Sequence, residues 1–305
     1  DFKDLTDFEQ HIFTSNLKRQ ILLDSVQGRS PNLAFLPIVS LPELETWIET
    51  WAFSETIHSK SYTHIIRNVY PDPSKVFDEM MSVNEIVDCS DSITEYYNSL
   101  IEYNRLRDSG SAKYNEYEHK KRIWMCLMSV NILEGVRFYV SFACSFYFGY
   151  RGKMEGNSKI IKFISRDENL HVAITQNIMK NWINNPDEGF QDIVKKNEDK
   201  VYAAYEMAVN AEKEWADYLF SKGSLIGLTA ESLKNYVEWL ANNRLTSIGY
   251  KKLYPHVKSN SLSGWLDSYY DSKKLQVAPQ ETELSSYVKG IDNTISDTAF
   301  DGFKL

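Results

Sequence analysis

The sequence contains few of the residues that interrupt helices. Its 305 residues include 13 glycines and 8 prolines, most of which lie between long periodic segments. This distribution favours an almost wholly helical chain with few turns. Segments with the alternating pattern of strands are scarce, so we expect an all-α fold.

Cysteine is also scarce. The three cysteines, Cys89, Cys126 and Cys144, are an odd number and include no close pair. This fits a reducing compartment, which we take to be the cytoplasm, better than a disulfide framework. We expect Cys126 and Cys144 to be ordinary core residues.

The sequence lacks an excess of positive charge and a long hydrophobic run. Its formal net charge is -8, and no face rich in lysine and arginine stands out, which argues against binding of nucleic acid. The most apolar run, Phe138 to Phe148, is too short to span a membrane, and no signal peptide is visible. The chain begins at Asp1 without an initiator methionine, which is consistent with a trimmed N-terminus.

Hydrophobic periodicity predicts where the helices lie. We expect them over residues 5–25, 42–70, 82–107, 117–150, 156–179, 186–222 and 229–254. From about residue 272 the chain is rich in serine, threonine and aspartate and has no sustained period. Its isolated hydrophobic residues suit a segment that orders on a partner, although a terminus without a role has the same composition. We therefore predict a helical domain over 1–271 and a flexible tail over 272–305.

A carboxylate and an imidazole occupy core positions in the second of these helices. Glu55 and His58 share one stripe with Trp51 and Tyr62, because helical steps of three or four residues keep all four on one face. Burying the pair without a partner would cost on the order of several kcal/mol. A bound cation would instead make both residues ligands.

The same E-x-x-H pattern recurs as Glu168 and His171 on an apolar helix face. Glu and His three apart project from successive turns and can share a metal, so two such helices could face each other across a paired site. A third copy, Glu116 and His119, has charged and polar neighbours. For that copy we predict a solvated helix face without a metal.

Two more carboxylates are candidate ligands. Glu134 lies in an apolar stripe of the helix over 117–150. Alone it could be a buried acid paired with Arg137, but beside two E-x-x-H helices a ligand is the better interpretation. Asp24 lies on the last turn of the first helix, and its spacing alone favours an ordinary polar residue there.

Together these residues supply four carboxylates and two imidazoles from four helices: Asp24, Glu55, His58, Glu134, Glu168 and His171. Four negative charges balance two divalent cations. Carboxylate-rich ligation with one histidine per metal suits iron or manganese better than zinc. Metals held this close could reduce dioxygen together, and a four-helix scaffold with this ligand set is the ferritin-like di-metal arrangement.

Tyr62 lies one turn beyond His58 on the same stripe, so its ring should lie close to the metals. It is either a core tyrosine with a hydrogen-bonded hydroxyl or a redox tyrosine that the metals and dioxygen oxidise. In the second case Phe138, Phe142 and Ile164 would form a dry lining that protects a radical. The spacing does not choose between these alternatives.

Several long motifs resemble one known family. They are L-L-D-S-V-Q-G-R-S-P, P-E-L-E-T-W-I-E-T-W-A-F-S-E-T-I-H-S-K-S-Y-T-H-I, L-E-G-V-R-F-Y-V-S-F-A-C-S-F, M-E-G-N-S-K-I-I-K-F-I-S-R-D-E-N-L-H and Q-V-A-P-Q-E-T-E-L-S-S-Y. They occur in order over nearly the whole chain. In this respect the sequence resembles the small, radical-generating subunit of class I ribonucleotide reductases of the bacterial and phage type.

The resemblance implies a ligand set for two iron ions per chain and a role for dioxygen in activation. One iron would be bound by Asp24, Glu55 and His58, and the other by Glu134, Glu168 and His171. Tyr62 would carry the stable radical. The resemblance thus assigns to Asp24 a role that its spacing does not.

The resemblance also implies partners. The small subunit would form a homodimer and pass its oxidising equivalent to a large catalytic subunit, without which it reduces no nucleotide. Asp167, Glu281 and Tyr287 match positions on or near the transfer route, and the C-terminal end, through Phe303 and Leu305, would dock on the large subunit. The family's N-terminal relay tryptophan has no match here, and trimming explains this most simply.

Two other functions compete with this one. A stand-alone di-iron oxidase or monooxygenase would need a substrate channel and no relay tail, so Tyr62 together with Tyr287 argues against it. A metal-storage protein would load mineral beyond two ions per chain. A purely structural helical protein would be stable without metal.

Overall fold

The computed structural model describes residues 1–271. The predicted tail, including Glu281, Tyr287, Phe303 and Leu305, lies outside the described residues, and the predicted division of the chain at residue 271 stays a prediction. Asp1–Tyr270 forms one compact unit.

Helices make up this unit, and the part of the chain that the structure describes contains no β-strand beyond an isolated bridge between Leu225 and Leu228. The predicted all-α class is confirmed. The α-helices are α1 (Asp7–Gln27), α2 (Ser30–Phe35), α3 (Pro42–Val69), α4 (Ser74–Asp78), α5 (Asn84–Asp108), α6 (Glu116–Ile132), α7 (Tyr139–Tyr150), α8 (Glu155–Asn184), α9 (Gln191–Lys196), α10 (Glu198–Leu219), α11 (Ala230–Ser247) and α12 (Ser263–Tyr270).

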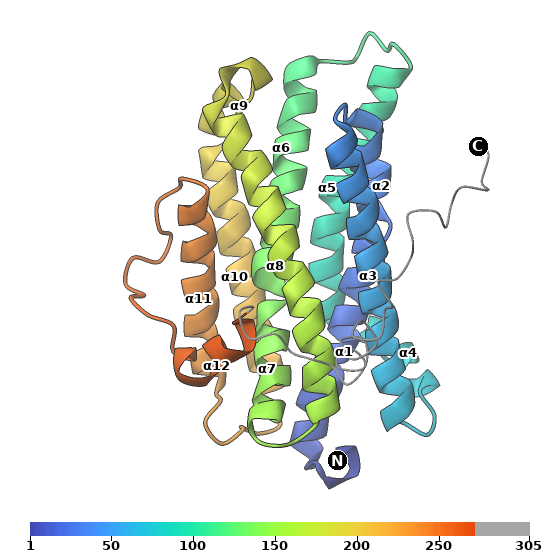
Figure 1. The fold of residues 1–305 in the computed structure, drawn as a ribbon, viewed down its shortest axis with the longest axis vertical. Coiled ribbons are helices and arrows are strands. Elements are labelled where there is room, and N and C mark those ends of the chain that lie inside the picture. Colours follow the sequence, from blue (N-terminus) through green and yellow to red (C-terminus); the bar gives the residue numbers. More distant parts are fainter. Residues whose placement is uncertain (272–305) are drawn as a thin grey trace, which may run out of the picture. The chain divides into compact units, whose positions relative to one another are not determined.

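The long helices lie side by side as a bundle (Figure 1). α1 packs on α3, α5 on α6, α7 on α8, and α10 on α11. Thr6 and Glu9 form a capping box that starts α1, and Pro42 occupies the first turn of α3, where its missing N–H costs nothing. Both helices begin and end within two residues of the predicted bounds.

α6 and α7 are parts of one helical run, Glu116–Tyr150, that passes through the middle of the bundle. Between them the π-helical segment η4 (Leu133–Arg137) widens one turn. The run is long and apolar enough to cross a membrane, but 94% of its most apolar window is buried inside the protein. A helix that is apolar on all sides and covered by other helices is the core helix of the bundle.

Three predicted helices differ from the structure. The helix predicted over 156–179 continues to Asn184 as α8. The segment predicted as one helix over 186–222 forms the 3-10 turn η5 (Pro186–Glu188), α9 and α10, because Gly189 takes the left-handed conformation with φ of 67°. The helix predicted over 229–254 ends at Ser247, before Gly249 with φ of 91°. The short helices α2, α4 and α12 have too few turns to produce a visible period.

The contact between α7 and α8 leaves no room for a larger side chain at Gly149. A Cβ there would lie 2.4 Å from Ser158 Oγ and 2.7 Å from Ser158 Cβ, whereas a Cβ at Gly156 would meet nothing within 4 Å. We predict that Gly149→Ala lowers the free energy of unfolding by about 1–3 kcal/mol. Urea denaturation measures the change, and Gly156→Ala is the matched control with no expected loss. Equal stabilities of the two variants would contradict this description of the contact.

Candidate metal centre

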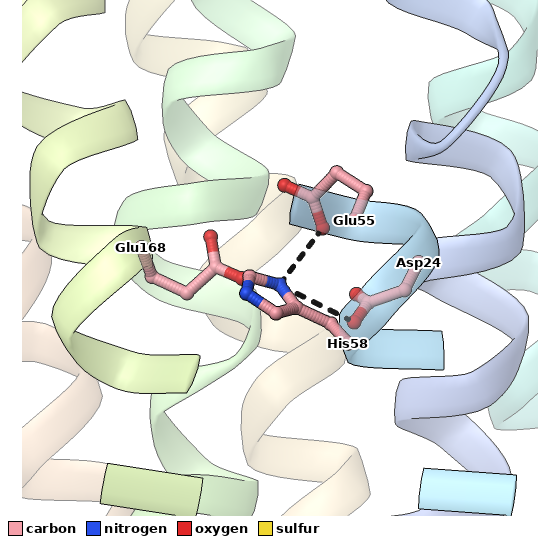
Figure 2. A group of neighbouring side chains, drawn as sticks. All are labelled: Asp24, Glu55, His58 and Glu168. Carbon is pink, nitrogen blue, oxygen red and sulfur yellow. Dashed lines mark hydrogen bonds and ion pairs between the residues drawn. The ribbon is translucent and has the colours of Figure 1, made fainter. Parts of the chain in front are cut away.

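Four helical elements bring the six predicted ligands together in the core. Asp24 comes from the last turn of α1, Glu134 from η4, and the two E-x-x-H pairs from α3 and α8. Figure 2 shows the carboxylates of Asp24, Glu55 and Glu168 directed at the imidazole of His58. All six side chains are at most 4% exposed, so the centre is closed to bulk water.

The six residues form two overlapping groups of possible ligand atoms. One group is Asp24, Glu55, His58 and Glu168, and the other is Glu55, Glu134, Glu168 and His171. Within each group the atoms lie within 4.8 Å of one another. Glu55 and Glu168 belong to both groups, so each can offer one oxygen to either metal.

Both imidazoles present Nδ1 to the same two carboxylates. His58 Nδ1 lies 3.3 Å from Glu55 Oε2 and 3.2 Å from Glu168 Oε1. His171 Nδ1 lies 3.0 Å from Glu55 Oε1 and 3.1 Å from Glu168 Oε2. The site therefore has approximate twofold similarity, with one histidine on each side of two shared carboxylates.

The electrostatics of the centre call for cations. Burial, together with the neighbouring carboxylates Glu55 and Glu168, raises the pKa values of Asp24 and Glu134 well above the usual range. Burial alone would raise the pKa of Glu168 as well, but contacts with Glu134 and His171 lower it. Among the described residues, both oxygens of Asp24 and Oε2 of Glu134 are buried and accept no hydrogen bond within normal distance. Their nearest cationic neighbours are the imidazoles, with His58 Nδ1 3.9 Å from Asp24 Oδ2 and His171 Nδ1 3.7 Å from Glu134 Oε2. Buried carboxylate oxygens that lack hydrogen bonds are costly, and a pair of divalent metals would satisfy them.

Comparison with known proteins identifies the family. The family model described as "Ribonucleotide reductase, small chain" matches residues 1–261. The chain belongs to this family. The earlier resemblance, and with it the assignment to the class I small subunit, is confirmed.

Individual relatives support the same family assignment. The ribonucleoside-diphosphate reductase subunit beta of Buchnera aphidicola (from Acyrthosiphon pisum) is 50% identical, over 100% of this chain and 84% of the relative. The protein of the same name from Haemophilus influenzae is 48% identical over the same shares. The solved ribonucleotide reductase R2 subunit from Clostridium botulinum has a TM-score of 0.74 and 28% identity, over 88% of this chain and 79% of that structure. The predicted ferritin-like fold is confirmed, and family and site together indicate a di-metal centre of iron or manganese.

Two neutral side chains, Gln27 and Trp51, donate hydrogen bonds to the carboxylates, and a third, Tyr97, donates to Gln27. Sequence analysis assigned no role at the centre to any of the three. Gln27 Nε2 donates to Glu134 Oε1, and Gln27 Oε1 in turn accepts a hydrogen bond of 2.7 Å from the Tyr97 hydroxyl. Trp51 Nε1 donates to Glu55 Oε1 at 2.9 Å. Such outer contacts fix the orientation of metal ligands. Helical spacing could have pointed to Gln27 and Trp51 as neighbours of the ligands, since Gln27 lies three residues after Asp24 and Trp51 lies four residues before Glu55.

Tyr62 is fully buried, and its hydroxyl has no hydrogen-bond partner among the described residues. The choice between a core tyrosine and a redox tyrosine stays a prediction. Burial and the charge of Asp24 raise the pKa of Tyr62 well above its usual value, so the side chain is a neutral phenol. Phe138, Phe142 and Ile164 are buried in the same core as Tyr62, and their contact with its ring stays a prediction.

Asp167 connects the centre to the outside of the bundle. Its Oδ2 lies 3.1 Å from His58 Nε2, on the side of the ring away from the carboxylates, and its side chain is 36% exposed. The second nitrogen of a metal-binding histidine commonly contacts a carboxylate in this way. The role of Asp167 in radical transfer stays a prediction.

One expectation about neighbouring residues is wrong, and one alternative interpretation does not hold. His119 of the third E-x-x-H copy is buried rather than solvated, because its Nε2 donates to Asn104 Oδ1 at 2.7 Å. Glu116 is exposed and pairs with Lys120. Arg137 makes no ion pair with Glu134; its guanidinium contacts Cys89 and Ser92 instead.

The contact between Gln27 and Glu134 gives a testable prediction. Replacing Gln27 with leucine removes the donor that orients Glu134, so we expect affinity for the second metal ion to fall by about 10–100-fold. Competition titration with a chelating dye measures this affinity. Gln20→Leu is the matched control, because Gln20 is equally buried on α1 and its side chain forms no hydrogen bond with the rest of residues 1–271. Equal losses in both variants would show that the orienting contact is unimportant.

Proposed function

We propose that this chain is the radical-generating small subunit of a ribonucleoside-diphosphate reductase, with a di-iron centre that reacts with dioxygen and oxidises Tyr62. The relatives named above carry the name of this enzyme. The observation that supports the proposal best is the fully buried phenol of Tyr62, which lies one turn from His58 and close enough to Asp24 for that carboxylate to raise its pKa.

The six ligands would be Asp24, Glu55, His58, Glu134, Glu168 and His171. When bound, the two metal ions would supply electrons to dioxygen and the oxidising power that takes one electron from Tyr62. Glu55 and Glu168, which belong to both groups of ligand atoms, could each offer an oxygen to either ion. The same donor set suits manganese, so the choice of iron rests on the resemblance of the motifs.

The chain's own residues would manage the proton and the radical. A phenol that loses an electron also loses its proton, and Asp24 is a suitable acceptor because its charge acts on Tyr62. The full burial of Tyr62 would keep a radical there in a dry environment. Phe138, Phe142 and Ile164 would extend this lining and slow quenching.

The small subunit works with a large subunit, in which nucleotides are reduced. We infer that the oxidising equivalent leaves by way of His58 and Asp167, since these two side chains lead from the centre to the exterior. Glu281 and Tyr287 would continue the route, and Phe303 and Leu305 would dock on the large subunit, as a tail over 272–305 requires. The three free cysteines among the described residues suit the cytoplasm.

A homodimer is part of the proposal. Phe53 and Ile57 are 65% and 43% exposed on α3, the helix that also carries Glu55 and His58. Large apolar side chains four residues apart form one exposed ridge, and such a ridge suits an interface between subunits. The overall negative charge gives no support to binding of nucleic acid.

Electron paramagnetic resonance tests the central step. We expect metal-free protein, loaded anaerobically with Fe(II) and then exposed to air, to develop a tyrosyl signal that Tyr62→Phe abolishes. Tyr97→Phe is the matched control, because Tyr97 is equally buried near the centre and its hydroxyl is hydrogen-bonded to Gln27. Oxidised iron without a tyrosyl signal in the wild-type chain would favour an oxidase or a storage protein.

The dimer has its own test. Phe53→Asp combined with Ile57→Asp should convert the dimer to monomers in sedimentation velocity experiments, because two buried charges would oppose each other across a twofold interface. Met207→Asp, at an exposed apolar residue on α10, should leave the dimer intact. A wild-type protein that sediments as a monomer would exclude this part of the proposal.

A further inference from the structure

A cavity with a buried cation in its wall lies apart from the metal ligands. It has a volume of about 420 Å³ and lies between α5, α6 and α10. Arg137 of η4 is one of the residues that line it, although Arg137 is only 6% exposed. In binding sites, a few polar groups in a mostly apolar wall fix the orientation of a ligand, and a guanidinium group selects an anion.

The guanidinium group of Arg137 has donors that the protein does not use. It carries five N–H groups, of which Nη1 contacts Cys89 Sγ at 2.8 Å and Nη2 contacts Ser92 Oγ at 3.2 Å. Within residues 1–271 this side chain has no further hydrogen bond and no carboxylate at ion-pair distance. Neither partner is a carboxylate, so the remaining N–H groups are available to an anion in the cavity.

The charges behind this wall do not balance. Arg19 of α1 contacts Cys89 from the other side and is paired with Glu212 of α10 through two hydrogen bonds. Glu212 also interacts electrostatically with Arg137, with which it forms no hydrogen bond. Two buried guanidinium groups therefore share one buried carboxylate. A buried surplus of one positive charge is unfavourable, and a monoanion in the cavity would offset it.

Two hydroxyl groups on the wall are free to donate to such an anion. Tyr96 and Ser99 of α5 line the cavity, and their hydroxyls form no hydrogen bond in the described part of the chain. Ser92 and Ser129 also line it, but their hydroxyls donate to backbone carbonyls. The one carboxylate among the lining residues, Glu95, is exposed and forms no ion pair with Arg137.

Most of the remaining wall is apolar. Ile93 and Ile132 are 2% and 3% exposed, and they line the cavity together with Ala204 and Met207 of α10. A second cavity of about 370 Å³ also has Ala204 and Met207 in its wall, so the two spaces adjoin. A hydrocarbon chain attached to an anion at Arg137 would therefore meet an apolar surface along its length.

We propose that this cavity binds a small aliphatic carboxylate, with its carboxylate against Arg137 and its hydrocarbon chain along the apolar wall. A carboxylate accepts two parallel hydrogen bonds from one guanidinium group. Its single charge equals the surplus that Arg19, Arg137 and Glu212 leave. A phosphate monoester carries close to two charges near neutral pH, which is more than this surplus.

Isothermal titration calorimetry of the full chain tests the proposal, with octanoate as the probe. Octanol, octylamine and octyl phosphate keep the hydrocarbon chain and change the head group. We expect octanoate to bind at least about tenfold more tightly than each of the other three, because hydrogen bonds to a charged partner are the stronger ones. No binding of octanoate, or equal binding of octanoate and octanol, would overturn the proposal. Tighter binding of octyl phosphate would overturn the choice of a carboxylate.

Two variants locate the head group. Arg137→Met removes the charge but keeps a long side chain, so affinity for octanoate should fall at least about tenfold while binding of octanol is unchanged. Arg122→Met is the matched control, because Arg122 lines the second cavity and not the first. Equal losses in both variants would overturn the proposal. The comparison of head groups in the wild-type chain does not depend on either variant folding.

The metal centre provides a last control. None of the six candidate ligands lines the cavity, so iron-loaded and metal-free protein should bind octanoate with the same affinity. Binding that occurs only in one of these forms would place octanoate at the metal centre and overturn the assignment to this cavity.

Discussion

Mutual repulsion among four buried carboxylates is the constraint on which the rest of this structure depends. Asp24, Glu55, Glu134 and Glu168 come from four elements and meet where bulk water does not reach. Packing of α1 on α3, of α3 on α8 and of η4 on α8 brings them together. Only protons or cations can offset that repulsion, and the raised pKa values of Asp24 and Glu134 are the consequence when protons do so. The helix packing that forms the core therefore also produces the repulsion that bound metal ions would relieve.

The side chains that donate hydrogen bonds to the carboxylates do not neutralise their negative charge. Gln27 and Trp51 donate hydrogen bonds to Glu134 and Glu55 without adding a charge. The buried cations of the core, Arg19 and Arg137, contact Cys89 and Glu212 instead. A guanidinium paired with Glu134 would neutralise one of the carboxylates that two divalent ions require. Orientation by neutral donors and exclusion of arginine are thus two parts of one arrangement.

Periodicity predicted much of this site, because a charged residue in an apolar stripe is visible in the sequence. Glu55 with His58 and Glu168 with His171 could be found in this way. Asp24 could not, since a single carboxylate near a helix end has an ordinary polar explanation. His119 shows the converse, because its polar sequence neighbours concealed a contact with Asn104 from another helix. The pairing of Arg19 with Glu212 is a tertiary contact across most of the chain and leaves no local pattern.

The π-helical turn explains how Glu134 and Arg137 avoid each other. Residues three apart on an α-helix lie close to the same face, which made an ion pair between them a reasonable expectation. The segment Leu133–Arg137 is wider than an α-helical turn, so the directions of residues three apart diverge more. Glu134 consequently joins the carboxylates while Arg137 turns toward Cys89 and the cavity. One irregular turn therefore separates a metal ligand from the cation that would otherwise compete with the metal.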